Sequence, residues 1–212
     1  MSGHKQDMPD ARQDVVNTGD PRMRSALYVQ AEKIIEATRL IELGARAGLA
    51  QQLTGIEKAK VNRLYRQLKG RPSPSGQTPF SDVWYLKDKR RLLEASVAWG
   101  LYKKLAQREL DSARLLIDVY QSYQAIVSRP LLDLTRVFFI PQLVQMGMWQ
   151  ESRCQYCQAS YLAPVEHLGH ACPGCELYYR YRCRECGTAL QVKTRGRYAI
   201  TCVDCRTTKN QG

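Results

Sequence analysis

The sequence predicts a mainly α-helical protein: a helical body that contains a helix-turn-helix-like segment, followed by small zinc-ribbon modules with short β-hairpins. Three observations predict this fold. Apolar residues recur at helical spacing up to about residue 150, a basic helix follows a turn glycine within that region, and all eight cysteines lie beyond it in CxxC pairs. We expect a disordered tail (1–24), a helical DNA-binding and oligomerisation domain (25–150), a first zinc site (151–178) and a second zinc ribbon (179–212).

The N-terminal segment is polar and contains residues that interrupt any helix, Gly3, Pro9, Gly19 and Pro21. It lacks the apolar core of a secretory signal, and thiols held by metal fit a reducing compartment, so we expect a cytoplasmic protein. No apolar run approaches the ~20 residues needed to cross a bilayer. The longest candidate, residues 137–140, is stopped by Pro141, so we expect no membrane contact.

Three helices are predicted next. The first runs from Ala26 to about Gly44, the second from Ala45 to Leu53, and the third from Glu57 to Lys69. The first has an apolar face formed by Leu27, Ile34, Ile35, Leu40, Ile41 and Leu43, and the third a buried stripe formed by Ile56, Val61, Leu64 and Leu68. A glycine with positive φ at position 55 supplies the tight turn that a helix-turn-helix needs.

The outer face of the third helix is basic and is the predicted DNA-binding surface. Its residues are Lys58, Lys60, Asn62, Arg63, Arg66 and Lys69. Arginine and asparagine can read base edges, whereas lysine neutralises phosphate. A basic amphipathic helix taken alone is more often a solvated face. The net charge of +12, the turn glycine and the downstream cysteine pairs favour nucleic acid as the partner.

Two or three further helices are predicted between residues 81 and 150. Apolar residues from Trp84 to Leu105 mark one, and those from Leu116 to Val127 mark another that Asp111 would cap. A cationic cluster accompanies the first: Lys87, Lys89, Arg90 and Arg91. It would either contact phosphate or form a solvated helix face.

The cysteines are the predicted metal ligands: Cys154, Cys157, Cys172, Cys175, Cys183, Cys186, Cys202 and Cys205. Two CxxC loops on facing hairpin tips complete the tetrahedral shell that Zn²⁺ prefers, so we expect two Zn²⁺ per chain. The order of the pairs permits both linear and cross-braced grouping. A hairpin predicted over 188–193 and 197–201 favours linear grouping for the second site. We expect His167 and His170 to face solvent.

Two functional classes compete. The first is a DNA-binding activator subunit whose ribbons present basic residues to the DNA backbone, namely Arg180, Arg182, Arg184, Lys193, Arg195 and Arg197. The second is a zinc-thiolate redox sensor or holdase, in which oxidation of the thiols ejects the metal. The sequence lacks a phosphate-binding glycine loop, an HExxH helix and a GxSxG elbow, and a tetrathiolate zinc is closed to substrate, so we do not expect an enzyme.

Several motifs also carry a family resemblance. They are Ile41–Arg46, Leu64–Gly70, Pro72–Gly76, Pro79–Ser81, Leu134–Arg136, Met146–Gly147 and Cys154–Cys157, in that order. Over residues 30–178 the chain resembles FlhC, the C subunit of the flagellar master transcriptional activator. The resemblance implies an all-helical body, a zinc site formed by the first four cysteines, an FlhD partner subunit, promoter DNA binding and recruitment of RNA polymerase. The N-terminal tail, Pro141 and the second cysteine quartet depart from the family pattern, so the quartet inherits no role.

Overall fold

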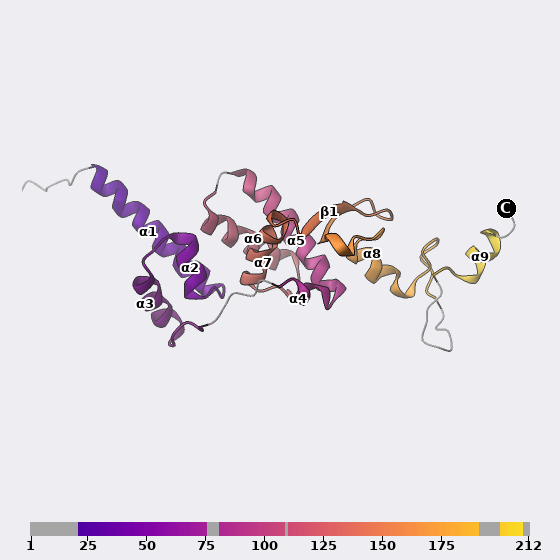
Figure 1. Ribbon diagram of the computed structural model, residues 1–212, viewed down its shortest axis with the longest axis horizontal. Helices are drawn as coiled ribbons and strands as arrows, with labels where there is room; N and C mark the ends of the chain where they lie inside the picture. The colour runs from indigo at the N-terminus through magenta and orange to yellow at the C-terminus, as the bar shows by residue number, and fades with distance from the viewer. Residues whose placement is uncertain (1–20, 76–80, 109, 191–199, 210–212) are drawn as a thin grey trace, which may run out of the picture.

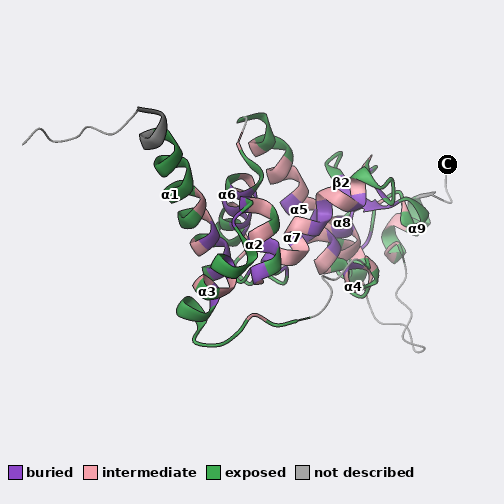
Figure 2. Ribbon diagram, turned by 60° about the vertical axis from the view of Figure 1, so that its left-hand side comes forward, coloured by how far each residue is buried: buried purple, intermediate pink, exposed green. Residues whose placement is uncertain are grey.

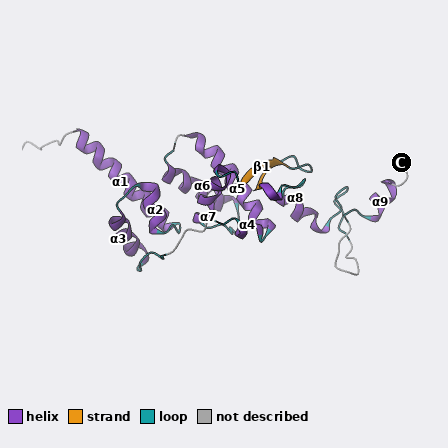
Figure 3. Ribbon diagram, viewed as in Figure 1, coloured by secondary structure: helices purple, strands orange, loops and turns teal. Residues whose placement is uncertain are grey.

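The computed structural model describes residues 21–75, 81–108, 110–190 and 200–209. Helices dominate it, and the described part has one two-stranded sheet (Figure 3). The helices are α1 (Pro21–Glu42), α2 (Ala47–Thr54), α3 (Lys58–Lys69), α4 (Val83–Leu86), α5 (Lys89–Leu105), α6 (Ser112–Ile126), α7 (Leu134–Gln145), α8 (Pro173–Tyr178) and α9 (Val203–Lys209). The strands are β1 (Trp149–Arg153) and β2 (Ser160–Pro164). The mainly helical fold predicted from the sequence is confirmed.

The chain is elongated, with α1 to α3 at one end, α4 to α7 in the middle and the cysteine-rich region at the other end (Figure 1). Short 3₁₀ turns at Ala106–Arg108, Val165–His167 and Tyr179–Tyr181 join some of these elements. The three groups of elements thus follow one another along the long axis in the order of the chain (Figure 1).

Helices α1, α2 and α3 pack against one another as a three-helix unit. Gly55 ends α2 in the left-handed region at φ 67°, and its N–H donates to the carbonyl of Gln51 at 2.9 Å. Glycine adopts this conformation without the steric penalty that a Cβ brings. The predicted helices and the turn glycine of the helix-turn-helix-like segment are thus confirmed.

Two predicted apolar stripes are only partly buried. On α3, Val61 is buried as expected, but Tyr65 replaces Leu68, which stays 37% exposed. Leu68 lies two turns after Val61 on the same stripe, and the stripe loses its cover in this last turn. On α1, Leu40 and Ile41 are buried whereas Leu27, Ile34 and Ile35 are exposed, because the N-terminal half of α1 extends past the helices on which its other half packs (Figure 2).

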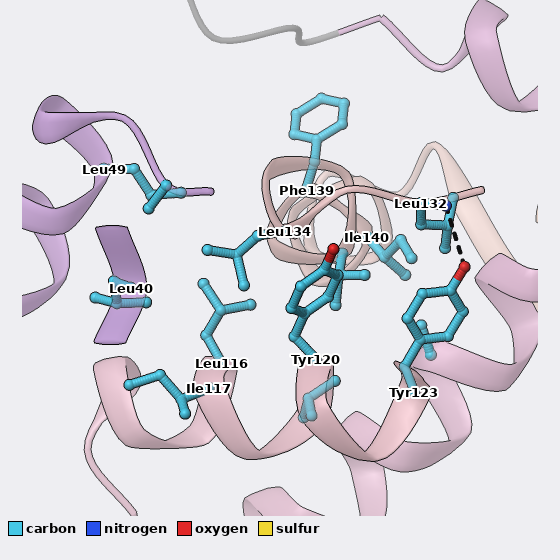
Figure 4. Packing of buried hydrophobic residues seen from close by; sticks show 14 of the residues in the cluster. Leu40, Leu49, Leu116, Ile117, Tyr120, Tyr123, Leu132, Leu134, Phe139 and Ile140 are labelled. Atoms are coloured by element: carbon cyan, nitrogen blue, oxygen red, sulfur yellow. Dashed lines mark hydrogen bonds between the residues drawn. The ribbon is translucent and has the colours of Figure 1, made fainter. Parts of the chain in front are cut away.

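The main core lies between α6 and α7 and reaches into the three-helix unit. Leu40 of α1 and Leu49 of α2 lie toward the α6 side chains Leu116 and Ile117, and Leu134 of α7 lies above them (Figure 4). These side chains are at most 6% exposed, and burying each one contributes about 1.5–3 kcal/mol. One continuous core therefore holds the basic helix unit to the rest of the body.

Aspartate caps set the starts of three helices. Asp88, Asp111 and Asp133 each accept an N–H two or three residues ahead, from Arg90, Arg114 and Arg136 respectively. The Asp111 cap was predicted. The single helix expected from Trp84 to Leu105 is wrong, because Asp88 adopts an extended conformation and divides it into α4 and α5.

Pro141, which stops the apolar run 137–140 and departs from the family pattern, lies inside α7, and the helix continues through it. Proline removes one backbone hydrogen bond and usually breaks a helix interior. Here the neighbouring side chains Val137, Ile140 and Leu143 are all at most 3% exposed, so packing holds the helix through the proline. No helix among the described residues is long and apolar enough to span a membrane.

Candidate metal centres and nucleic-acid interface

The first group of cysteines lies where the β1–β2 hairpin meets α8. Cys154 follows β1 directly, and Cys157 lies in the turn before β2. Cys172 caps α8 and Cys175 lies in its first turn, with its N–H donating to the Cys172 Sγ at 3.3 Å. The expectation of two facing hairpin tips is therefore wrong for the second pair, which a helix N-terminus presents instead. We call this group the first centre.

The other four cysteines, the second centre, repeat the same local pattern. The N–H of Cys202 donates to the Cys183 Sγ at 3.3 Å, as the N–H of Cys172 does to the Cys154 Sγ at 3.2 Å. The residue after each first CxxC has positive φ, and α9 begins directly after Cys202 as α8 begins directly after Cys172. The two centres are structural repeats.

The geometry groups the cysteines linearly, which settles the choice between linear and cross-braced grouping. Within each group the sulfur atoms lie within 4.8 Å of one another. The Cys157–Cys172 and Cys186–Cys202 sulfur pairs are 3.7 and 3.6 Å apart. Bonds of about 2.3 Å from Zn²⁺ to sulfur in a tetrahedron require an edge of about 3.8 Å. The donor sets therefore fit tetrathiolate binding of a metal such as zinc.

Backbone N–H groups favour the ionised form of one thiol in each centre. Burial raises the pKa of the Cys154 thiol, but N–H groups of Cys157, Cys172 and Tyr156 outweigh this effect and lower the pKa to about 6. In the second centre, the N–H groups of Cys186 and Cys202 lower the pKa of Cys183 to about 6.

The last thiol of each centre has a raised pKa and resists ionisation. Burial and the sulfurs of Cys157 and Cys154 raise the pKa of Cys175, and the sulfurs of Cys202 and Cys186 raise that of Cys205. Four thiolates side by side repel one another unless a cation lies among them. Each centre is thus suited to a divalent metal ion.

The first centre is fixed to the helical body. Ser96 of α5 accepts the N–H of Leu162 at 3.0 Å and donates to its carbonyl at 3.3 Å. Lys89 of α5 forms an ion pair with Glu176 of α8 at 2.7 Å. A Cβ on Gly174 would lie 3.4 Å from the Leu93 side chain, so α8 approaches α5 closely. The first centre therefore belongs to the body of the protein.

The second centre is more exposed. Cys183 is buried, but Cys186 is exposed and Cys202 and Cys205 are half-buried, whereas three of the four thiols of the first centre are buried. Arginine and tyrosine side chains connect it to the first centre: Arg184 donates to the Tyr156 hydroxyl at 3.1 Å, and Arg182 lies over the Tyr178 ring at 5.1 Å. Sequence reasoning missed these contacts, although the alternation of Tyr and Arg at 178–184 is visible.

The two histidines lie outside both groups. His167 and His170 are exposed, and the His170 Nδ1 lies 2.9 Å from the Gln155 side-chain nitrogen. The hairpin predicted over 188–193 and 197–201 falls mostly outside the described residues, as do Lys193, Arg195 and Arg197. Within the described part, Arg182 and Ala189 form an isolated bridge.

The predicted DNA-binding residues all lie on α3. Five of them are exposed, and Asn62 is half-buried. Lys60 lies 3.9 Å from Glu57, and the Lys69 Nζ donates to the Glu42 carbonyl at 3.4 Å. The cationic cluster near α5 is mostly engaged within the protein: Lys89 pairs with Glu176, Arg90 with Glu94, and Arg91 lies over the Trp84 ring.

The fold and the sites define a helical protein with two tetrathiolate centres, and comparison with known proteins places it in the class of transcriptional regulators. The model of the family described as flagellar transcriptional activator (FlhC) matches residues 23–195, so the chain belongs to the FlhC family. Transcriptional regulators are not a class of enzymes. The matched region includes the first centre and ends before Cys202 and Cys205.

Individual relatives agree with the family match. The chain is 29% identical over 159 residues to the flagellar transcriptional regulator FlhC of Verminephrobacter eiseniae, covering 73% of this chain and 85% of the relative. It is 29% identical over 147 residues to that of Pectobacterium carotovorum, covering 67% and 76%. The protein of the same name from Paraburkholderia atlantica is 28% identical over 153 residues, covering 69% of each chain.

Proposed function

We propose that this protein is a DNA-binding activator subunit for flagellar genes, which acts in the cytoplasm with an FlhD-like subunit and recruits RNA polymerase. One Zn²⁺ in each centre would hold the C-terminal region. The observation that carries the proposal is the helix-turn-helix-like unit with its exposed basic helix, in a member of a family of flagellar transcriptional regulators.

The spacing of residues on α3 supports DNA contact. Lys58, Asn62, Arg66 and Lys69 follow one another at intervals of three or four, so they share one face of the helix. Val61 and Tyr65 are buried and form a separate stripe that adjoins this face. A recognition helix needs this division between a packed face and a free polar face. The shared face would enter the major groove, with Arg66 and Asn62 toward base edges and the lysines toward phosphates.

The exposed part of α1 supports a partner subunit. Leu27, Tyr28, Ile34 and Ile35 are between 44% and 74% exposed, and their spacing of one, seven and eight residues places them on one face. This stripe leads into a groove of about 200 Å³ that is lined by Ile34 of α1, by Ile56 and by α3 residues that include Leu64, Lys60 and Arg63. A continuous apolar surface of this kind fits a helix of another protein. We assign it to the FlhD-like subunit.

A pair of α3 substitutions tests the DNA-binding proposal. Arg66→Ala should weaken binding at a cognate flagellar promoter by about 1–3 kcal/mol and reduce discrimination between promoters. Lys58→Ala should weaken binding to cognate and scrambled duplexes equally and lower the salt slope by about one. Lys104→Ala, an exposed lysine on α5, is the control. Equal, small effects from all three would mean that α3 is only a solvated face.

Native mass spectrometry of the co-expressed complex tests the partner and metal proposals together, because it counts subunits and metals. Ile35→Glu should abolish the hetero-oligomer, and Ile126→Glu, which is 62% exposed on α6, should leave it intact. A stable monomer that binds promoter DNA unaided, or a dimer of this chain alone, would contradict the partner proposal. A count near one zinc per chain would contradict metal binding at both centres.

The exposure of Cys186 favours one alternative, a zinc-thiolate redox sensor or holdase, because exposed thiolates are accessible to oxidants. A promoter footprint under reducing conditions separates the two functions. The activator reading expects a footprint that mild oxidant leaves unchanged, whereas the sensor reading expects it to disappear as zinc is released.

A further inference from the structure

A basic cleft lies where the helical body meets the link between the two centres. It has a volume of about 520 Å³. Lys87 and Lys89, just before α5 and at its start, line one side, and residues after α8, including Arg180 and Arg184, line the other. Ile200, which stands just before the last cysteine pair, completes the wall.

The cleft has cations to spare for a ligand. Its two acids are engaged: Glu176 pairs with Lys89 at 2.7 Å, and Asp88 accepts the backbone N–H of Arg90 at 2.9 Å. Lys87, Arg180 and Arg184 are exposed and form no ion pair with any residue that the structure describes. The neighbouring tyrosine rings orient the guanidinium groups, with Arg180 5.3 Å from the Tyr181 ring.

The second centre builds one wall of this cleft. The N–H of Arg184 donates to the Ile200 carbonyl at 3.1 Å, which joins two lining residues directly. Each lies beside a ligand position of the second centre: Arg184 follows Cys183, and Ile200 stands two residues before Cys202. The Cys202 N–H donates to the Cys183 Sγ and so joins the same two segments of the chain. Loss of the second centre would separate the two lining residues.

We propose that this cleft binds the phosphate backbone of duplex DNA and that the second cysteine centre serves to form it. The inference rests on the proposed DNA-binding function and deepens it. Guanidinium groups match phosphate oxygens with paired N–H donors, and contacts to phosphate carry no sequence information directly. It lies apart from α3 along the long axis of the molecule (Figure 1), so its contact extends the DNA site on one flank.

Binding measurements at several salt concentrations, with hydroxyl-radical footprints, test this inference on the complete complex. The variant Lys87→Gln/Arg180→Gln should weaken binding to cognate and scrambled duplexes by the same factor, on the order of tenfold, and lower the slope of the salt dependence by about two. Protection should be lost on one flank only. The control is Lys104→Gln/Arg108→Gln, which removes two exposed cations elsewhere on the body and should change neither the slope nor the footprint.

The role of the second centre is tested with Cys205→Ser. Native mass spectrometry should show one zinc retained per chain. The variant should also lose protection on the same flank of the footprint, and its salt slope should fall by the same amount as in the double cleft variant. Combining the two should add little further loss. A normal slope and footprint in the double cleft variant would overturn the phosphate site, and a normal footprint in Cys205→Ser would overturn the role of the second centre.

The variant Arg66→Ala distinguishes failure of this inference from failure of the proposed function. If Arg66→Ala relaxes promoter discrimination while the cleft variants behave as the wild type, the inference fails and the proposed function stands. If the wild-type complex shows no preference for promoter DNA, the proposed function fails and the inference falls with it.

Discussion

The buried hydroxyl of Tyr123 should be one of the strongest polar determinants of stability in the helical body. The hydroxyl donates to the Glu94 carboxylate, and it accepts the N–H of Leu132 at 3.1 Å. Glu94 itself is 3% exposed and also accepts the N–H of Leu131 at 2.7 Å. This network joins α5 and α6 to the segment that leads into α7, and Figure 4 shows the bond between Tyr123 and Leu132.

Tyr123→Phe removes only the hydroxyl, so the loss can be worked from its two bonds. A buried N–H left unsatisfied at Leu132 costs about 1–3 kcal/mol, and a lost hydrogen bond to a charged group about 1.5–3 kcal/mol. We therefore expect a destabilisation of about 3–5 kcal/mol, since the two effects occur together. This is a large fraction of the stability of a typical domain.

Urea unfolding of the zinc-loaded chain, followed by circular dichroism, measures this effect. The matched control is Tyr120→Phe, one turn earlier on α6. Tyr120 is also buried and its ring stacks with that of Tyr123 at 6.1 Å, but its hydroxyl makes no hydrogen bond with the described residues. It should lose less than about 1 kcal/mol. Similar losses in the two variants would refute the reasoning, as would additivity between Tyr123→Phe and Glu94→Gln, which share one bond.

Three further predictions concern the turn, the contact between α1 and α6, and the metals. Gly55→Ala should destabilise the chain by about 1–2 kcal/mol in thermal unfolding, because it forces a Cβ into the left-handed region, whereas Gly48→Ala inside α2 should stabilise it by about 0.5–1 kcal/mol; a destabilising Gly48→Ala would show that helix packing dominates. Burial, and to a smaller extent Asp111, raises the pKa of Glu36, so the ionised carboxylate opposes folding and stability falls as pH rises through that pKa. Glu36→Gln should therefore stabilise the chain at pH 7 and lose this advantage in acid. An equal gain at every pH would contradict the assignment. Because the pKa of the Cys154 thiol is lowered to about 6, the stability that metal binding provides should be present above the ordinary thiol pKa and decline as pH falls through about 6. A chromophoric chelator should remove zinc first from the second centre, whose thiols are more exposed. Simultaneous release from both centres would count against an effect of their different burial.

The local features of the fold followed from the sequence because their causes are local. Helix periodicity, the glycine at 55 and the aspartate cap at 111 depend on residues a few positions apart, and the structure agrees with each. The cysteine quartets were visible for the same reason. Linear grouping became certain only in three dimensions, since both groupings suit the order of the pairs.

The remaining features depend on what surrounds each residue. The sequence pattern could not show that α7 continues through Pro141, because burial of Val137 and Ile140 decides this. Nor could periodicity distinguish the buried part of α1 from the apolar part that reaches solvent, since both have the same spacing. The use of a helix N-terminus in place of a hairpin for Cys172 and Cys175 was equally hidden, because a CxxC pair fits both.

The repetition of one hydrogen-bond pattern in both cysteine centres bears on how the chain is made. All four ligands of each centre lie within a short stretch of chain, so each site closes through local contacts that form quickly. The first can be complete on the ribosome as soon as its helix has emerged, before the second quartet has been synthesised. Metal supply during translation would then set the order of maturation. Under zinc starvation, newly made molecules would accumulate with a finished body and an unformed C-terminal end.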